Sequence, residues 1–500
     1  MSTAASRAWL GVALVGFAVV ALVLVLSLIP RLSAGQQVID ATEPAFADQR
    51  VPGTRAGVSL LSQYVDLVDP LLTARGGGSR QVRSLVRLIR RELGLSSAQV
   101  RKLLRREAPR IEALMRALPL TGVADEVPRL TAYLATTLTM SEDEIAATIE
   151  QDFPRLAQLL TTLPNVTDTW YDVPGVEGLT RVARDKPVRT VPGLRKYLRD
   201  DVVPLTVEHK HEVQGLAGRG GIGYIPYLLL FGGLALLAYG LLQARRATIT
   251  APGRRSWAFV VATGALLVAL VGAGQLFPRL GGAQRLVADF EPVFAQERVQ
   301  GLTIGWDTLH EAVVLGDPII TPAGGAAREA PRLYRLVAER TGRKRGDVRR
   351  ALRRRVPRTI ALLDALPLTL VAAEVPKLFA YLSRALRLRP SKLVARLRRR
   401  APALTQALLA APAVTTGWTA MPGAAELTRF DDVTPVRTLP ALDEYLRQDL
   451  VTVLGEQRAH FDRFASGPPP IQRLAPALLI LGLLVMLYGG LMMRLVGRRY

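Results

Sequence analysis

The sequence predicts an all-α membrane protein with four transmembrane helices in two parallel internal repeats, each repeat flanking a large, mainly helical extracytoplasmic domain. Two observations lead to this prediction. Four apolar blocks without a charged side chain are each about 20 residues long, enough for a helix to cross a hydrocarbon core of about 30 Å. In addition, the stretch ALPLTGVADEVPRLTAYL at 117–134 returns as ALPLTLVAAEVPKLFAYL at 365–382.

The apolar blocks are interpreted as transmembrane helices. They run from Trp9 to Ile29, Tyr224 to Gln243, Trp257 to Phe277 and Leu474 to Met493. Buried helices of a soluble protein are the alternative, which the lack of charge in all four blocks disfavours. A cleaved signal peptide is the alternative for the first block. Because that block repeats inside the chain, starting at Trp257, we expect it to remain in the mature protein.

The repeat extends far beyond the two matching stretches. An ungapped shift of 248 residues makes 82 of the 197 positions from Trp9 to Leu205 identical to their counterparts. After Leu205 the register slips by one, and the second apolar block then matches the fourth. The repeated unit is therefore helix, domain, helix. Because each copy crosses the bilayer twice, both copies enter it in the same orientation, and a pseudo-twofold axis along the membrane normal is expected.

Charge in the short segments predicts the orientation. These segments contain arginines and no acidic residue; the arginines are Arg7, Arg245, Arg246, Arg254, Arg255, Arg494, Arg498 and Arg499. By the positive-inside rule both termini and the central linker are cytoplasmic, which places the large domains outside. The arginine, alanine and leucine bias is typical of a high-GC bacterial gene. We therefore expect a multi-pass protein of a bacterial plasma membrane.

The predicted order along the chain combines these assignments. It is a cytoplasmic N-terminus at 1–8, helix 9–29, extracytoplasmic domain 30–223, helix 224–243, basic cytoplasmic linker 244–256, helix 257–277, a second and more basic domain 278–473, helix 474–493 and a cytoplasmic tail at 494–500. Glycine-rich stretches at 75–79, 218–223 and 323–327 are expected breaks or joints, and SGPPP at 466–470 is an expected stiff spacer.

Within each domain, apolar residues at helical spacing predict short stacked helices. Pro109, Pro154, Pro357 and Pro402 interrupt these runs, and each either starts a new helix or kinks a continuous one. Ser141 followed three residues later by Glu144 is typical of a capping box. Proline and glycine recur in 165–189 and 413–437, where we expect irregular chain held by Trp170 and Trp418.

The sequence offers little for catalysis. There are no cysteines and only four histidines, so thiolate chemistry is excluded. His209 and His211 have metal-ligand spacing, but the second half lacks them and a surface pair is the preferred interpretation. Asp200 matches Gln448, and the repeated Asp201 and Asp449 are interpreted as a polar edge or helix-end contact. We expect no enzyme activity, cofactor or metal.

Basic charge is the strongest unusual feature. Residues 31–222 contain 26 basic and 23 acidic residues, whereas 278–474 contain 31 and 19. On a helix, Val348, Ala351, Leu352 and Val356 form an apolar stripe with arginines over the remaining face. The candidate anion-binding residues are Arg343, Lys344, Arg345, Arg349, Arg350, Arg353, Arg354, Arg355, Arg398, Arg399 and Arg400. A solvated face without a ligand is the alternative interpretation.

These features predict a non-catalytic membrane protein of the cell envelope whose duplicated helical domains bind a partner protein or an anionic envelope component. The alternative function is a transport component that handles lipid or another apolar molecule between the membrane and the outer envelope. Nucleic acid is not expected, because the domains are predicted to lie outside and few aromatics accompany the arginines. Glycines seven residues apart in the second and fourth apolar blocks allow close helix packing, either within the chain or between copies.

Overall fold

The computed structural model describes residues 2–182, 185–217, 221–247, 254–321, 325–467 and 470–497, and these ranges are helical apart from turns, loops and two isolated β-bridges. The chain forms two compact units. The span unit comprises Met1–Val51, Pro204–Val299 and Thr452–Tyr500, and the lobed unit comprises Pro52–Val203 and Gln300–Val451. Each unit takes segments from both halves of the chain, so the halves interlock in both.

The span unit contains the membrane-length helices. Its helices are α1 (Ser2–Val25), α2 (Leu28–Thr42), α13 (Lys210–Ala217), α14 (Ile225–Arg246), α15 (Arg254–Ala273), α16 (Leu276–Phe294), α25 (Thr452–Ala465) and α26 (Leu474–Gly497). Among the described residues, four segments are long and apolar enough to cross a membrane: Ser6–Val25, Ile222–Arg246, Arg254–Ala273 and Ile471–Val496. The expected four spans are thus confirmed as apolar helices of sufficient length.

Two of the predicted blocks are shorter as helices than their apolar run. α1 ends at Val25 and α15 ends at Ala273, because Ser27 and Gln275 have positive φ angles of 47° and 51°. A left-handed residue interrupts the i to i−4 hydrogen-bond ladder, so a new helix begins directly after each. The apolar pattern continues through both breaks, which is why composition alone extended the helices to Ile29 and Phe277.

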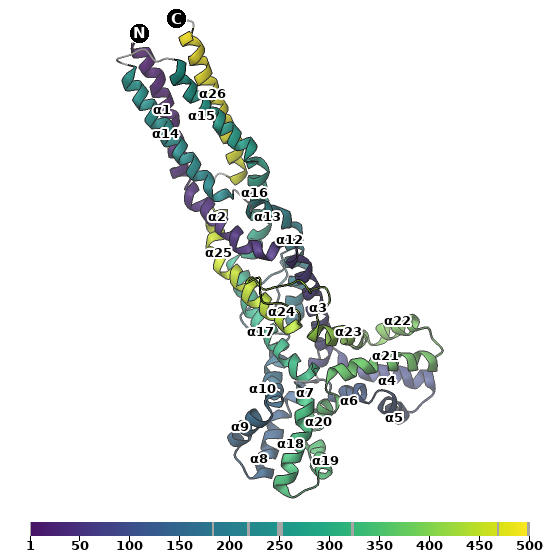
Figure 1. The fold of residues 1–500 in the computed structure, drawn as a ribbon. Coiled ribbons are helices and arrows are strands. Elements are labelled where there is room, and N and C mark those ends of the chain that lie inside the picture. Colours follow the sequence, from purple (N-terminus) through teal and green to yellow (C-terminus); the bar gives the residue numbers. More distant parts are fainter. Residues whose placement is uncertain are drawn as a thin grey trace. The chain divides into compact units, whose positions relative to one another are not determined.

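In the span unit, α1 lies along α14 and α15 lies along α26 (Figure 1). Glycines allow the backbones to meet. A Cβ atom on Gly16 would lie 2.4 Å from the backbone nitrogen of Leu237, and one on Gly264 would lie 2.6 Å from that of Met486. Any larger side chain at either glycine would separate the pair. Ala269, also on α15, lies outside this face because it is exposed.

Aromatic rings join the two helix pairs. Trp9 and Trp257, which are 248 residues apart, stack with ring centroids 3.8 Å apart. The Tyr239 hydroxyl donates to the carbonyl of Ser256 at 3.2 Å, and the Tyr488 hydroxyl donates to a carbonyl in α1 at 2.9 Å. Matched residues of the two halves therefore make matched contacts across the stack.

The lobed unit contains the helical repeats. Its helices are α3 (Arg50–Leu72), α4 (Gly78–Leu93), α5 (Ser97–Glu107), α6 (Pro109–Ala117), α7 (Thr121–Ala124), α8 (Val127–Leu138), α9 (Glu142–Asp152), α10 (Pro154–Thr169), α11 (Val191–Tyr197), α17 (Gln296–Ile320), α18 (Ala326–Thr341), α19 (Arg345–Arg355), α20 (Pro357–Ala365), α21 (Leu368–Ala385), α22 (Pro390–Arg400), α23 (Pro402–Thr419) and α24 (Leu439–Glu444). Near the boundaries between the two units lie two π-helical segments, Leu198–Val202 and Tyr445–Val451, and the short helix α12 (Val203–Glu208).

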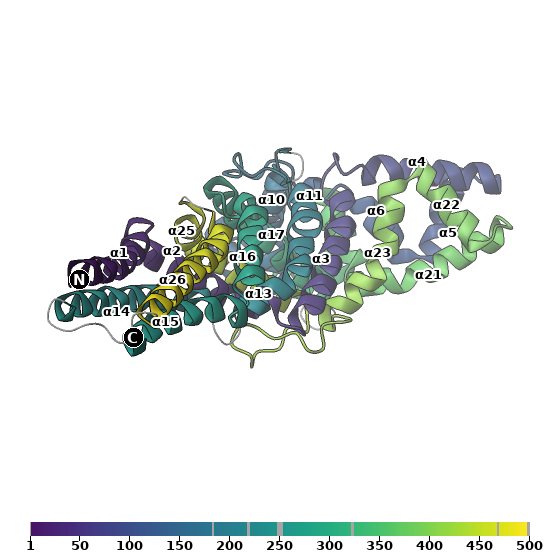
Figure 2. The same cartoon turned by 90° about the horizontal axis from the view of Figure 1, so that it is seen from above.

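Each lobe of this unit is built from both halves. Lobe A consists of α4–α6 packed with α21–α23, which Figure 2 shows together, and lobe B consists of α18–α20 packed with α7–α10. The central contact is between α6 and α20, which are matched helices of the two halves. α20 and α21 meet at a bend of 75°, and only the two helices taken together are long and apolar enough to cross a membrane.

The four prolines start new helices. Pro109, Pro154, Pro357 and Pro402 are the first residues of α6, α10, α20 and α23, where a missing N–H costs nothing. The predicted capping box at Ser141 is confirmed.

The irregular segments are shorter than predicted. α10 and α23 continue through an internal proline to Thr169 and Thr419. Trp170 begins the first irregular segment as expected, and its indole N–H donates to Asp69 at 2.8 Å. Parts of the predicted joints and spacer, at 218–220, 322–324 and 468–469, lie outside the described residues.

Carboxylates from one half cap helices of the other. Glu126 accepts hydrogen bonds from the backbone N–H groups of Arg358 at 3.2 Å and Thr359 at 2.8 Å, in the first turn of α20. Its counterpart Glu374 accepts from the N–H of Arg110 at 2.9 Å, in the first turn of α6. A negative charge at a helix N-terminus satisfies free N–H groups and complements the helix dipole.

A second exchanged cap repeats the pattern further out. Gln81 on α4 accepts from the backbone N–H of Leu404 at 2.9 Å, at the start of α23. Glu329, its counterpart on α18, accepts from the N–H of Leu156 at 2.7 Å, at the start of α10. Both lobes are therefore held by side chains of one half bound to backbone of the other.

Replacing Glu126 with alanine should destabilise the lobed unit by about 1–3 kcal/mol, because three hydrogen bonds to a buried carboxylate are lost. Glu126→Gln retains an acceptor and should lose less. Thermal unfolding of the full chain in detergent measures the effect, with Glu150→Ala as the exposed control. Equal unfolding temperatures for Glu126→Ala and Glu150→Ala would show that the exchanged cap contributes nothing.

Candidate anion-binding surfaces

Most of the predicted anion-binding residues lie on or beside α19 in lobe B. Val348, Leu352 and Val356 are buried under the helix, whereas Ala351 is only partly buried. Three of the four predicted stripe residues are thus confirmed as buried, and the arginines are directed outward. All eleven candidates are exposed: Arg343, Lys344, Arg345, Arg349, Arg350, Arg353, Arg354, Arg355, Arg398, Arg399 and Arg400. Solvent, or a ligand, can therefore reach every one of these cations.

The structure separates these candidates into two patches. Arg398, Arg399 and Arg400 form the last turn of α22 in lobe A, where Leu393 and Leu397 are buried. α22 packs on α21, α23 and α4, whereas α19 packs on α18, α20 and α8. The predicted basic surface is thus one patch on each lobe.

Several of the arginines have intramolecular partners. Arg353 pairs with Asp364 at 3.0 Å, Arg349 pairs with the same carboxylate, and Arg350 pairs with Asp347. These pairs neutralise part of the charge on α19. Exposed pairs of this kind contribute little to stability, so they are available for exchange with an external anion.

The remaining candidates lack an acidic partner. Among the described residues, no carboxylate lies within 4.0 Å of Arg343, Lys344, Arg345, Arg354, Arg355, Arg398, Arg399 or Arg400. The Arg355 guanidinium instead lies over the ring of Tyr133, 5.1 Å from its centroid. This cation–π contact holds the guanidinium at the junction of α19 and α8 and leaves its N–H groups free to bind an anion.

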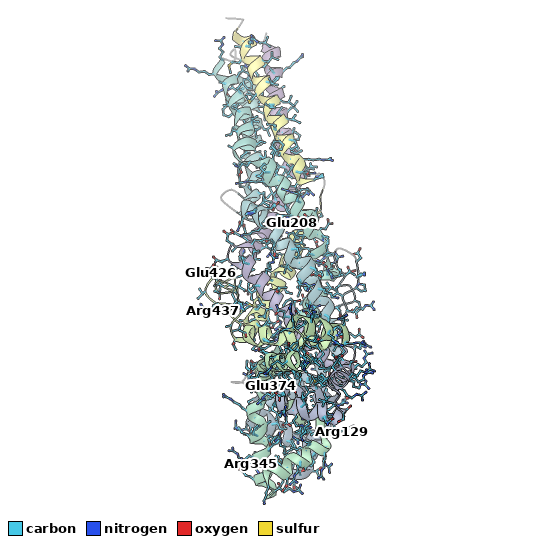
Figure 3. All side chains as sticks on the ribbon, turned by 90° about the vertical axis from the view of Figure 1, so that its right-hand side faces the viewer. Arg129, Glu208, Arg345, Glu374, Glu426 and Arg437 are labelled. Carbon is cyan, nitrogen blue, oxygen red and sulfur yellow. The ribbon has the colours of Figure 1, made fainter. Side chains whose placement is uncertain are left out.

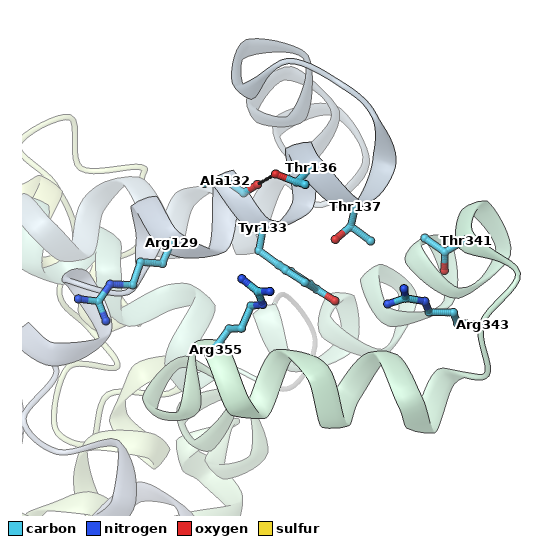
Figure 4. Close-up of a pocket in the computed structure, with 8 residues that line it drawn as sticks. All are labelled: Arg129, Ala132, Tyr133, Thr136, Thr137, Thr341, Arg343 and Arg355. Carbon is cyan, nitrogen blue, oxygen red and sulfur yellow. Dashed lines mark hydrogen bonds between the residues drawn. The ribbon is translucent and has the colours of Figure 1, made fainter.

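A groove opens at this junction (Figure 4). It has a volume of about 780 Å³ and is lined by Arg129, Ala132, Tyr133, Thr136, Thr137, Thr341, Arg343 and Arg355. Arg343 reaches in from the α18–α19 turn toward the Tyr133 hydroxyl, while Arg129 lies further along α8. Arg129 and Arg345, both on lobe B, are labelled in Figure 3. Three cationic and four hydroxyl side chains therefore share one hollow, and none of the described residues that line it is acidic.

Sequence reasoning missed the α8 side of this groove. Arg129 and Tyr133 lie four residues apart on one helix face, next to Thr136 and Thr137, and this spacing was a usable signal. It was overlooked because the first half is nearly neutral overall. The approach of α8 to α19 joins residues more than 200 positions apart, which no local pattern indicates.

A second basic groove lies in lobe A, among α4, α5 and α6. Its volume is about 770 Å³, and its charged lining residues are Arg80, Arg83, Arg87, Arg101, Glu112 and Arg116. Glu112 is only 3% exposed and pairs with Arg116 at 3.0 Å and Arg105 at 3.6 Å. The buried Glu112 carboxylate therefore already neutralises part of the positive charge of this groove.

No family model, curated protein or solved structure matches the chain.

The other sequence candidates are arranged differently. His209 is buried and His211 is exposed, so the two rings do not share a site; within the described ranges no cluster of three metal-ligand side chains occurs. Asp201 accepts a bidentate pair of hydrogen bonds from Arg181, at 2.6 and 2.8 Å, and Asp449 makes the matched contact with Arg429. Both aspartates tie an irregular segment to a π-helical turn.

One buried aspartate of the lobed unit, Asp443, has a histidine partner. Asp443, 2% exposed, accepts from the Trp306 indole at 3.0 Å and contacts His310 Nδ1 at 2.5 Å. Hydrogen bonding to Asp443 raises the pKa of His310, and burial, followed by the charge of Asp443, raises the pKa of Tyr64. The Tyr64 hydroxyl donates to a backbone carbonyl, so it is not poised as a base.

The His310–Asp443 pair should make stability depend on pH. The folded-state pKa of His310 is raised, so its contribution is fully present below the ordinary histidine pKa of about 6.5 and is lost as pH rises through the folded-state pKa. Unfolding temperatures of wild type and His310→Asn should therefore converge above that pH. His211→Asn is the exposed control, and a wild-type difference that stays constant from acid to alkaline pH would contradict the assignment.

Proposed function

We propose that the protein is a non-catalytic integral membrane protein of the bacterial cell envelope, whose helical domains lie outside the plasma membrane and bind an anionic envelope component or an acidic partner protein. The observation that supports this most directly is the set of exposed guanidinium groups on lobes A and B that have no carboxylate partner among the described residues. Such cations retain their full attraction for an external anion.

Membrane insertion is supported by the outer surface of the four long helices. Leu14 is 66% exposed, Leu266 is 69% exposed and Leu487 is 69% exposed. Apolar side chains facing outward from several turns of each helix would be unfavourable in water and are favourable in lipid. The helix pairs bury their glycine faces internally, which leaves leucine, isoleucine and phenylalanine for the lipid.

A duplicated, parallel arrangement is supported by the matched contacts. The exchanged caps of Glu126 and Glu374, and the Trp9–Trp257 stack, each relate positions 248 apart. In the proposed orientation both termini and the linker are cytoplasmic. Arginines in the last turn of α14 and the first turn of α15 support it. Linker residues 248–253 and tail residues 498–500 lie outside the described residues.

Lipid handling is the second candidate, and one groove bears on it. Between α3 and α23 a groove of about 540 Å³ is lined by Ala56, Ser59, Leu60, Gln63, Pro412, Ala413, Thr416 and Pro422. Short side chains and three polar groups line it, so it offers an acyl chain little apolar depth. The arginine surfaces therefore support anion binding better than this groove supports lipid transfer.

Topology can be measured directly because the chain has no cysteine. A membrane-impermeant maleimide should label Ala98→Cys, exposed in lobe A, in intact spheroplasts, and Thr250→Cys in the linker only after permeabilisation. Both variants keep the arginines that set orientation. Labelling of Thr250→Cys but not Ala98→Cys in intact spheroplasts would reverse the orientation and reject extracytoplasmic binding.

Anion binding is tested with the full chain in phosphatidylcholine nanodiscs. Labelled dextran sulfate should bind, with affinity falling as salt rises because screening weakens exposed charge, and uncharged dextran of the same length should not bind. Equal binding of the two dextrans, or none of either, would contradict the proposal and leave the lipid-handling function as the better candidate.

A further inference from the structure

The groove in lobe B has an unusual electrostatic composition. Arg129, Arg343 and Arg355 line one hollow, none of its lining residues is acidic, and no carboxylate lies within 4.0 Å of the three guanidinium groups in the described part of the chain. Elsewhere on α19, arginines at similar exposure pair with Asp347 or Asp364. Cations that line one hollow without an acid repel one another, and an anion bound among them offsets this repulsion by attracting each of them.

The hydroxyl groups of the groove have defined roles. Thr136 donates to the carbonyl of Ala132 at 2.9 Å, and Thr341 donates to that of Val337 at 2.6 Å. Their oxygens therefore remain as acceptors. Donors are supplied by the guanidinium groups, while acceptors face any hydroxyl that a ligand presents. The groove suits a ligand that carries both anionic oxygens and hydroxyl groups.

Its size and lining restrict the ligand further. A volume of about 780 Å³ is far more than one phosphate requires. Beyond the Tyr133 ring, Ala132 is the apolar side chain among the lining residues, so acyl chains have no adequate surface. We infer that this groove binds a phosphodiester-linked polyol or sugar chain, with phosphates on the guanidinium groups and ligand hydroxyls on the threonines. The inference rests on the proposed function and specifies its ligand.

The matched surface on lobe A is not built in this way. There, Glu107 stands at the position of Arg355, and Leu95 stands at the position of Arg343. Glu107 is paired with Arg106 at 2.8 Å. A phosphodiester chain would meet a carboxylate at that surface, where lobe B presents a guanidinium group. The groove charge is therefore specific to one lobe and does not follow from the duplicated plan.

The test uses the full chain in phosphatidylcholine nanodiscs and a fluorescent poly(glycerol phosphate) oligomer. The groove variant replaces Arg129, Arg343 and Arg355 with alanine. The matched control replaces three exposed arginines outside the anion-binding candidates, Arg91, Arg387 and Arg389, and so removes the same charge. The groove variant should bind at least about 100-fold more weakly than wild type, because charge-assisted bidentate contacts are lost, and the control should stay within about threefold.

A second variant separates shape from charge. Arg355→Lys retains the charge but loses the planar fork and its seat over Tyr133, and should weaken oligomer binding by about tenfold. Unchanged affinity in this variant would show that Arg355 makes no bidentate contact with the ligand phosphate. Unfolding temperatures equal to wild type confirm that each variant is folded.

The remaining outcomes distinguish the two proposals. Equal losses in the groove variant and its matched control would overturn the groove and leave diffuse anion binding intact. If the wild-type protein binds dextran sulfate but not the oligomer, the groove inference is rejected and the proposed anion-binding function stands. Failure to bind either polymer would overturn both proposals. Competition by phosphatidylglycerol vesicles as strong as that by free oligomer would identify a lipid headgroup and overturn the polymer assignment.

Discussion

The lobed unit depends on side chains from one half of the chain that accept hydrogen bonds from helix N-termini of the other. Glu126 and Glu374 do this at the centre, beside the contact between α6 and α20, and Gln81 and Glu329 do it further out. A helix that begins with proline has no N–H at its first position and leaves the next ones unsatisfied. In the folded chain, each half therefore supplies the acceptors for helix ends of the other half.

This exchange decides where the chemistry lies. If each half folded by itself, the arginines of α19 would face helices of the second half. Instead, the packing of lobe B places α19 against α8, so Arg355 lies over Tyr133 and the threonines of α8 line the groove. A surface that the sequence describes as a basic helix thus becomes a lined groove with hydroxyl groups on the opposite wall. The local sequence supplies the charge, and the exchange supplies the shape.

Much of the architecture was predictable because it depends on local patterns. Uncharged apolar runs indicated the membrane-length helices, and the capping box at Ser141 indicated a helix start. The stripe of Val348, Leu352 and Val356 correctly predicted which face of α19 is buried. The breaks at Ser27 and Gln275 were not predictable, because a left-handed backbone inside an apolar run has no compositional signal when the residue is not glycine.

The groove itself was beyond sequence reasoning for a different reason. The repeat predicts related folds for 117–134 and 365–382, but not which copy of one helix packs on which copy of another. Two arrangements satisfy the same pattern, one within each half and one exchanged. The capping residues distinguish them only once distances are known, since a glutamate on α7–α8 could cap α6 or α20 equally well by spacing.

Differences between the halves carry more information about function than their likeness does. In the first half Arg195 pairs with Asp66, whereas in the second half Asp443, at the position of Arg195, binds His310 on α17. The two pairs use different positions on the partner helix, because Asp66 corresponds to Val314 and His310 to Ser62. Each half nevertheless keeps one pair between matched helices, with the charges reversed, as expected for a structural interaction. At the grooves the change has the opposite character. Where the first half has Glu107, paired with Arg106, the second half has Arg355. The second half therefore lacks this ion pair and carries a cation without an acidic partner. Arg355 gains a cation–π contact with Tyr133 but no charge partner, and binding of an external anion would supply that partner.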